Sequence, residues 1–401
     1  MSEHSRLLIT DVRLPFGDAE SLDLLIEGER IARIEPSIEA GPNDRVERAN
    51  GRLALPGFVD AHCHLDKTLV GRPWHSHRAG NSVAERVRID HELRRGLGMP
   101  SVHNTTALVE QIIRSGTTSV RTHTEIDTEV GLAGVEVVSA VAERFRGDIT
   151  IQQVAFPQSG MLADAAVEGL LSEAIDRGVR VIGGLDPAGA ERDPVGHLNR
   201  IFALAVAKDC EIDLHLHDPG ELGAWELDLI SERTRVEGLS GRVNVSHAIA
   251  LGQVDAGRQA RLAEAMAAAG VSMTTCVAHN DPPPPVELLF DSGVLLTAGN
   301  DSIRNTWSPF GTGDMLERAW ILAVRCGLRT DEQLQLALTI ASAHGSALVR
   351  GEGTSALEVG SIADLVLVDA LNVGDALARR PARDLVVHRG RVSARATPEA
   401  A

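Results

Sequence analysis

Two histidines separated by one residue, His62 and His64, end a short apolar run that is typical of a β-strand. Successive side chains of a strand point to opposite faces, so these two imidazoles project together and Cys63 projects away from them. A pair of imidazoles on one face is a natural half of a metal site. The pair alone is a weak signal, because chance pairs are common in a chain with 15 histidines.

Further metal-binding residue types lie at the ends of other predicted strands. They are His215, His217, His247 and Asp301. In a parallel barrel the carboxyl ends of all strands lie on one face, where the active sites of that fold are found. A single such histidine is more often a structural residue with its own hydrogen-bond partner. Several strand-end histidines together with an aspartate favour a metal centre.

Eight short runs rich in β-branched residues are predicted to be the strands that position these groups. They are 57–62, 117–123, 149–156, 179–185, 211–217, 242–248, 271–277 and 294–301. Between them, segments such as ARLAEAMAAAG carry apolar residues three and four apart and close on Gly, which is typical of a capped helix. This alternation predicts an α/β fold, a (β/α)8 TIM barrel, although an open doubly wound sheet would share the local pattern.

The two ends of the chain differ from its middle. Both read as short alternating strands with Gly turns, which predicts a small β-sandwich formed by residues 1–56 and 350–401 together. The barrel is then residues 57–349. The span 65–100 is the longest connection leaving a barrel strand, and we expect it to shape or cover the site.

Composition excludes two classes of partner. The formal net charge of −17 argues against nucleic acid and against an anionic membrane, since either needs clustered Lys and Arg. No apolar stretch approaches the roughly 18–20 residues of a membrane span. Four cysteines far apart, and an N-terminus without a signal-peptide pattern, predict a reducing cytoplasm.

A resemblance to the amidohydrolase superfamily is carried by LPGFVDAHCHLDK and, further along the chain, by DLHLHD, VSHA and GND. The cytosine deaminase-like branch of that superfamily is resembled in VRTHTEID, QVAFPQSG and GNDSIRNTWSPFGTGDM. The segments HLHDPGELG, GGLDPA and DSIRNTWSPFG are more similar to triazine-degrading members of this branch. The motifs follow the family's order and span nearly the whole chain.

This resemblance implies that His62, His64, His215 and Asp301 bind the metal. Superfamily barrels with two metals carry a carboxylated lysine on the fourth strand, whereas the corresponding run here, VIGGLDPAG, has no lysine. One divalent metal ion per subunit is therefore expected. Nitrogen and oxygen ligands suit Zn²⁺ first, with Fe²⁺ as the alternative.

Three side chains have expected catalytic roles. A bound metal lowers the pKa of water from 15.7 toward about 7, which supplies hydroxide at neutral pH. Asp301 is expected to take the proton of that water, and His247 to hydrogen-bond the hydroxide or the oxyanion that follows. Asp218 lies where cytosine deaminases carry Glu, and it is expected to protonate the leaving amine as general acid.

Four further residues are expected to bind substrate. Gln158 matches the amide that reads the carbonyl and N–H edge of the ring in cytosine deaminases, although a loop amide that caps backbone is an equal alternative. Ser302 stands where those enzymes have a second Asp, so recognition of the exocyclic amine is expected to differ. Trp307 is expected to form a pocket wall. His217 is expected to line the site or to donate a hydrogen bond behind it.

The sequence therefore predicts a metal-dependent hydrolase that releases ammonia or an alkylamine from a pyrimidine- or triazine-like heterocycle. A cyclic amidase that opens a lactam ring is the alternative within catalysis, since the same site can attack a ring carbonyl. A non-catalytic metal-binding barrel is disfavoured by the complete set of site residues. The resemblance also suggests a homo-oligomer.

Overall fold

The computed structural model describes residues 6–15, 21–78, 80, 82–162, 164–277, 281–351 and 356–396. Eight parallel strands form one sheet in which each strand pairs with its neighbour in sequence. They are β6 (Phe58–Cys63), β7 (Thr117–Glu125), β8 (Thr150–Phe156), β9 (Val181–Leu185), β10 (Glu211–Leu216), β11 (Val243–His247), β12 (Val271–Thr275) and β13 (Leu296–Ala298). Every run predicted to be a barrel strand overlaps one of them, so the predicted TIM barrel is confirmed.

The sheet closes where the last strand meets the first. A parallel bridge joins Cys63 to Asp301, and the Asp301 N–H donates to the carbonyl of His62 at 2.8 Å. Gly299 makes this approach possible, because a Cβ at that position would lie 2.5 Å from the His62 oxygen and 2.6 Å from its Cβ. Glycine is therefore required at this seam by close backbone contact.

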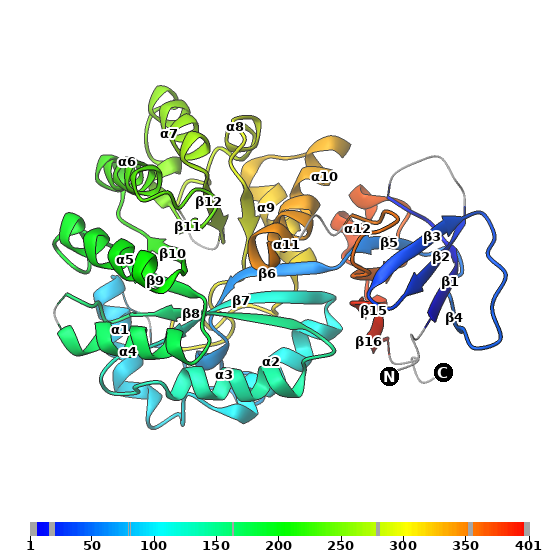
Figure 1. Ribbon diagram of the computed structural model, residues 1–401, viewed down its shortest axis with the longest axis horizontal. Coiled ribbons are helices and arrows are strands. Elements are labelled where there is room, and N and C mark those ends of the chain that lie inside the picture. The colour runs from blue at the N-terminus through cyan, green and yellow to red at the C-terminus, as the bar shows by residue number, and fades with distance from the viewer. Residues whose placement is uncertain are drawn as a thin grey trace.

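Helices surround the strands, as Figure 1 shows. They are α1 (Val83–Arg94), α2 (Val102–Arg114), α3 (Ala133–Arg144), α4 (Ala165–Asp176), α5 (Pro194–Lys208), α6 (Gly220–Val236), α7 (Ala256–Ala269), α8 (Val286–Asp291), α9 (Met315–Cys326), α10 (Asp331–Ile340) and α11 (Ala343–Arg350). Two 3-10 turns, η1 (Leu65–Lys67) and η2 (Ile249–Gly252), follow barrel strands. The apolar faces of the helices pack on the strands and form the main core.

Helix ends follow from local chemistry. The predicted helix ARLAEAMAAAG is α7, which ends where Gly270 takes a left-handed conformation at φ 69°. Asp164 begins α4 by accepting a hydrogen bond from the Ala166 N–H. Thr330 and Gln333 begin α10 with a reciprocal capping box. Capped ends such as these fix where each helix begins and ends, and therefore where the neighbouring strands can begin.

The two ends of the chain build two four-stranded sheets, at the right of Figure 1. One has the order β3-β2-β1-β4 and the other β16-β15-β14-β5. Their strands are β1 (Arg6–Val12), β2 (Leu22–Glu27), β3 (Arg30–Glu35), β4 (Arg45–Arg48), β5 (Leu53–Pro56), β14 (Leu365–Val368), β15 (Arg383–His388) and β16 (Arg391–Arg395), with helix α12 (Val373–Arg379) between β14 and β15. The division of the chain into 1–56 plus 350–401 and 57–349 stays a prediction.

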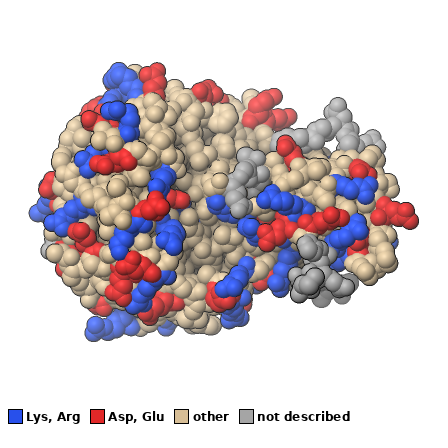
Figure 2. All heavy atoms as spheres, in the orientation of Figure 1, with Lys and Arg blue, Asp and Glu red and all other residues tan. Residues whose placement is uncertain are grey.

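Surface charge and helix hydrophobicity are relevant to the prediction that neither nucleic acid nor a membrane is a partner. Acidic and basic side chains are interspersed over the face seen in Figure 2. Within the described ranges, no helix is long and apolar enough to cross a bilayer. The long connection 65–100 holds η1 and α1, and it reaches the carboxyl ends of the barrel strands.

Candidate metal centre and active site

A cavity of about 250 Å³ opens at the carboxyl ends of the barrel strands. It is lined by residues at or just after the ends of most of the strands, including His64 after β6, His215 of β10 and His247 of β11. The connection 65–100 contributes Lys67, Ser82, Val83 and Arg86 to its wall. The predicted role of that connection in shaping the site therefore has a physical basis.

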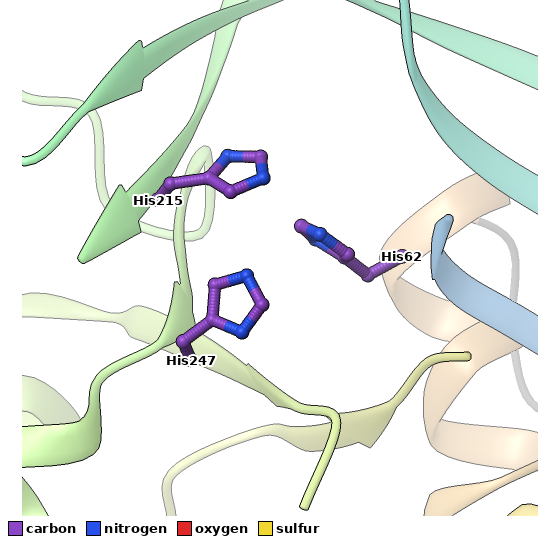
Figure 3. Close-up of side chains that lie close together, drawn as sticks. All are labelled: His62, His215 and His247. Atoms are coloured by element: carbon purple, nitrogen blue, oxygen red, sulfur yellow. The ribbon is translucent and has the colours of Figure 1, made fainter. Parts of the chain in front are cut away.

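The four predicted metal ligands lie close together: His64, His215 and Asp301 line this cavity, and His62 is fully buried beside them. The Nε2 atoms of His62 and His64 lie 3.8 and 3.4 Å from Asp301 Oδ1, and the His62 and His215 rings are 4.6 Å apart. His62, His215 and His247 also form a cluster whose nitrogens are within 4.8 Å of one another, and Figure 3 shows them facing one another. The side chains thus meet although Asp301 follows His62 by more than 200 residues.

Protonation and hydrogen bonding leave these groups suited to a cation. Burial lowers the pKa of His62 to about 3 and that of His215 well below its usual range, so both imidazoles are neutral at pH 7. His62 Nε2 and both ring nitrogens of His215 are buried without a hydrogen-bond partner among the described residues. Burial would raise the pKa of Asp301, but its hydrogen bond with His64 and its electrostatic interactions with the surrounding imidazoles hold that pKa well below its usual range.

The Nδ1 atoms of His62 and His64 are both engaged in hydrogen bonds. His62 Nδ1 contacts Ser246 Oγ at 2.8 Å, and His64 Nδ1 donates to the carbonyl of His123 at 3.0 Å. A donor hydrogen at Nδ1 leaves the lone pair on Nε2, which is the arrangement that metal ligation requires. Phe156 stacks on His215 with ring centroids 4.1 Å apart and limits its rotation.

The backbone is strained at two of these positions. His247 has φ 73° and Asp301 has φ 59°, in the left-handed region that residues other than glycine seldom adopt. Such conformations persist only where the surrounding structure imposes them, and they cluster at functional sites. Both residues were predicted to act on the nucleophile.

Asp218 lies differently from its predicted role. Its Oδ2 accepts hydrogen bonds from the backbone N–H groups of Ala188 and Gly189, at 3.1 and 3.0 Å, and it is not among the residues that line the cavity. Its neighbour is Glu226, which accepts from the same Ala188 N–H at 2.9 Å. This placement gives Asp218 a part in holding the loop after β9 and disfavours the general-acid role expected of it.

His217, unlike Asp218, lines the cavity. Its backbone N–H and its Nδ1 both bond to the carboxylate of Asp186, at 2.7 and 3.0 Å, so Nε2 is the ring nitrogen left for a ligand. Burial lowers the pKa of His217, but the charge and hydrogen bond of Asp186 outweigh burial and raise it overall. The His217 and His247 rings lie 4.2 Å apart. His217 is thus an imidazole held by a carboxylate, with one nitrogen directed at the substrate space.

Gln158 is oriented by a buried lysine. Its Oε1 accepts from Lys67 Nζ, which also pairs with Glu125 at 2.9 Å and lies 3.7 Å from Asp90. The Nε2 of Gln158 is buried with no partner in the described part of the chain, and the residue lines the cavity. Gln158 therefore offers a donor to a ligand, because its carbonyl is already engaged.

Ser302 and Trp307 also line the cavity, and their contacts with substrate stay a prediction. Three further residues of the site escaped the sequence analysis: Lys67, Phe156 and Asp186. Lys67 stands three residues after His64, and Asp186 directly follows the strand VIGGL, so both carry a strand-end signal. Their partners, such as Glu125 for Lys67 and His217 for Asp186, come from other elements of the fold, which the local sequence does not reveal.

Known proteins are similar to this chain over most of its length. The family model described as "Amidohydrolase family" matches residues 45–394. N-isopropylammelide isopropyl amidohydrolase of Pseudomonas sp. (strain ADP) is 32% identical over 399 residues, covering 98% of both chains. Pterin deaminase of Rhizobium rhizogenes is 26% identical over 372 residues, covering 86% of this chain and 82% of its own.

Solved structures are similar over the full length. The crystal structure of N-isopropylammelide isopropylaminohydrolase from Burkholderia multivorans has a TM-score of 0.93 at 40% identity, covering 98% of each chain. That of 5-methylcytosine deaminase from Klebsiella pneumoniae, with 5-fluorocytosine, has a TM-score of 0.83 at 24% identity and the same coverage.

The pair of Asp218 and Glu226 predicts a pH-dependent stability. Burial, followed by the charge and hydrogen bond of Asp218, raises the pKa of Glu226 from 4.5 to about 8. Glu226 therefore stays protonated in the folded chain at pH values where it ionises in the unfolded chain, and its contribution to stability is lost as pH rises from about 4.5 to about 8. In thermal unfolding, the Tm of wild type minus that of Glu226→Gln should fall across this range. Glu232→Gln, at an exposed position of the same helix, is the control; parallel Tm profiles for wild type and Glu226→Gln would contradict the assignment.

Proposed function

This chain belongs to the amidohydrolase family, and we propose that it hydrolyses an exocyclic carbon–nitrogen bond of a small pyrimidine- or triazine-like heterocycle, with release of ammonia or an alkylamine. It is a hydrolase that acts on carbon–nitrogen bonds. The observation that carries the narrower proposal is the meeting of three histidines and Asp301 beside a cavity with a free amide donor.

The proposed cofactor is one divalent metal ion per subunit, held by His62, His64, His215 and Asp301. Buried, neutral imidazole nitrogens without partners and an ionised carboxylate fit such an ion, and β9 contains no lysine for a second one. Nitrogen and oxygen ligands suit Zn²⁺ first and Fe²⁺ second. When bound, the metal supplies a nucleophile at neutral pH by lowering the pKa of coordinated water.

The proposed substrate is a single polar ring. A cavity of about 250 Å³ is at the small end of ligand sites, which suits one ring better than a fused or extended ligand. The Gln158 amide donor supports a ring edge that presents an acceptor, such as a carbonyl oxygen. Trp307 and Phe156 supply apolar walls for the ring.

Proton transfers are assigned to side chains around the ring. Asp301 is proposed to accept the proton of the attacking water, and His247 to hydrogen-bond the oxygen as charge develops on it. His217 is proposed to deliver a proton to the leaving nitrogen, since its Nδ1 is held by Asp186 and its Nε2 is available. Asp218 has no part in this assignment because its carboxylate holds the backbone of residues 188 and 189.

The names of the relatives set the order in which substrates are tried. Two of them act on N-isopropylammelide by name, so alkylamino-triazines come first, with aminopyrimidines second. A cytoplasmic location is proposed because all four cysteines are free thiols. The expected homo-oligomer stays a prediction.

Amine release tests the proposed reaction. Wild type and Asp301→Asn would be incubated with alkylamino-triazines, aminopyrimidines and cyclic amides, and ammonia, alkylamine and ring-opened products measured. We expect release from one ring class and a loss of about 10²–10⁴-fold in kcat in the variant, the usual contribution of a positioned base. A ring-opened carboxylate without amine release would instead establish the cyclic amidase alternative.

The identity of the general acid is tested by paired variants. His217→Asn should lower kcat by about 10²–10⁴-fold with a smaller change in KM, because the proton is needed only as the amine leaves. Asp218→Asn should keep kcat within about tenfold of wild type on the same substrate. The reverse ranking in steady-state kinetics would restore the general-acid role to Asp218.

A further inference from the structure

A line of buried polar groups runs through the barrel interior to His62. It starts at Arg121 on β7, passes Asp213 on β10 and Ser246 on β11, and ends at His62 on β6. Arg121 Nη1 lies 3.0 Å from Asp213 Oδ2, Ser246 Oγ donates to Asp213 Oδ1 at 2.7 Å, and His62 Nδ1 lies 2.8 Å from Ser246 Oγ. All four side chains are fully buried. Four different strands are thus joined behind one candidate metal ligand.

The direction of each hydrogen bond follows from counting protons. An aspartate carboxylate facing a guanidinium only accepts, so the single hydroxyl proton of Ser246 goes to Asp213. The remaining lone pairs of Ser246 can only accept, and His62 Nδ1 must therefore carry a hydrogen. That tautomer leaves the lone pair on His62 Nε2, which has no partner in the part of the chain that the structure describes.

Arg121 fixes which oxygen of Asp213 faces the serine. Its guanidinium also bonds to Gln152 Oε1 at 2.6 Å, Glu211 Oε2 at 2.7 Å and the carbonyl of Leu348 at 3.0 Å. Held on three other sides, it cannot turn away from Asp213 Oδ2. The other oxygen, Oδ1, is thereby committed to Ser246.

His64 offers an internal comparison. Its Nδ1 donates to a backbone carbonyl, which no side-chain substitution removes. Of these two described histidines, His62 is the one whose tautomer depends on a replaceable hydroxyl.

We propose that Ser246 and Asp213 are positioning residues that fix the tautomer and ring orientation of His62, with Arg121 as the anchor of Asp213. The proposal rests on the proposed function insofar as His62 is a metal ligand. Hydrogen bonding of this kind orients a ligating imidazole and raises its basicity, and its loss costs about 10–100-fold in metal affinity.

Replacing Asp213 with asparagine gives the sharpest expectation. Arg121 donates to the Oδ2 position, so the amide oxygen of Asp213→Asn must occupy it and the amide nitrogen must face Ser246. Ser246 then accepts from the amide and turns its proton toward His62 Nδ1. His62 is driven to the opposite tautomer, with its hydrogen on Nε2, where the metal would bind.

Zinc affinity and histidine tautomers test the proposal without an activity assay. Metal-free wild type, Ser246→Ala, Ser246→Thr and Asp213→Asn would be titrated with Zn²⁺ against a chromophoric chelator. The His62 tautomer would be measured by NMR of protein with ¹⁵N-labelled histidine. We expect Kd to rise about 10–100-fold in Ser246→Ala, to recover in Ser246→Thr, and the tautomer to switch in Asp213→Asn.

The matched control is Ser342→Ala, the same substitution at a buried serine whose hydroxyl donates to the carbonyl of Leu338 rather than to a residue of this line or to Asn244, which donates to Ser246. It should leave Kd for Zn²⁺ at the wild-type value, while the Tm of each metal-free variant reports on folding. Wild-type Kd in Ser246→Ala together with an unchanged tautomer in Asp213→Asn would overturn the proposal. Absence of zinc binding by wild type would instead overturn the proposed function, and the tautomer measurement on the metal-free chain would still decide the role of Ser246 and Asp213.

Discussion

The site depends on the closure of the barrel at one seam. The backbone hydrogen bond from Asp301 to His62 brings the last strand against the first, and Gly299 removes the side chain that would block it. Because the carboxyl ends of all the strands then share one rim, residues distant in sequence can act on one small molecule. The strained backbone at Asp301 is a local cost of turning its carboxylate toward the histidines.

Burial of the histidines is the second constraint on the site. Neutral imidazoles in a closed space without hydrogen-bond partners are costly, and a cation at the centre would satisfy them. Beneath them, His62 Nδ1 is paired with Ser246 within the barrel, so the nitrogen of His62 that is left without a partner is Nε2. Nearer the substrate, Lys67 occupies the Oε1 atom of Gln158 and leaves its Nε2 for a ligand. Asp186 in the same way occupies Nδ1 of His217 and leaves its Nε2.

The sequence predicted the fold well because its signals are local. β-branched runs, periodic helices and Gly caps recur along the chain, and each predicted barrel run overlaps a strand. The strand-end histidines could be placed on one rim for the same reason. The position of Asp218 could not be predicted in this way, because β10 ends at Leu216 and strand alternation no longer applies beyond it. The direction of the Asp218 side chain depends instead on the N–H groups of residues 188 and 189, to which it is hydrogen-bonded. The orientation of the Gln158 amide likewise depends on Lys67, which lies in the 3-10 turn η1 after β6.

The central claim is a single metal held by nitrogen and oxygen ligands alone, and X-ray absorption spectroscopy of the zinc-loaded chain tests it most directly. The account predicts one zinc per chain with nitrogen and oxygen neighbours at about 2.0–2.2 Å. A sulfur neighbour at about 2.3 Å, from a nearby thiol such as Cys63, or a second metal at about 3.5–4 Å would contradict it.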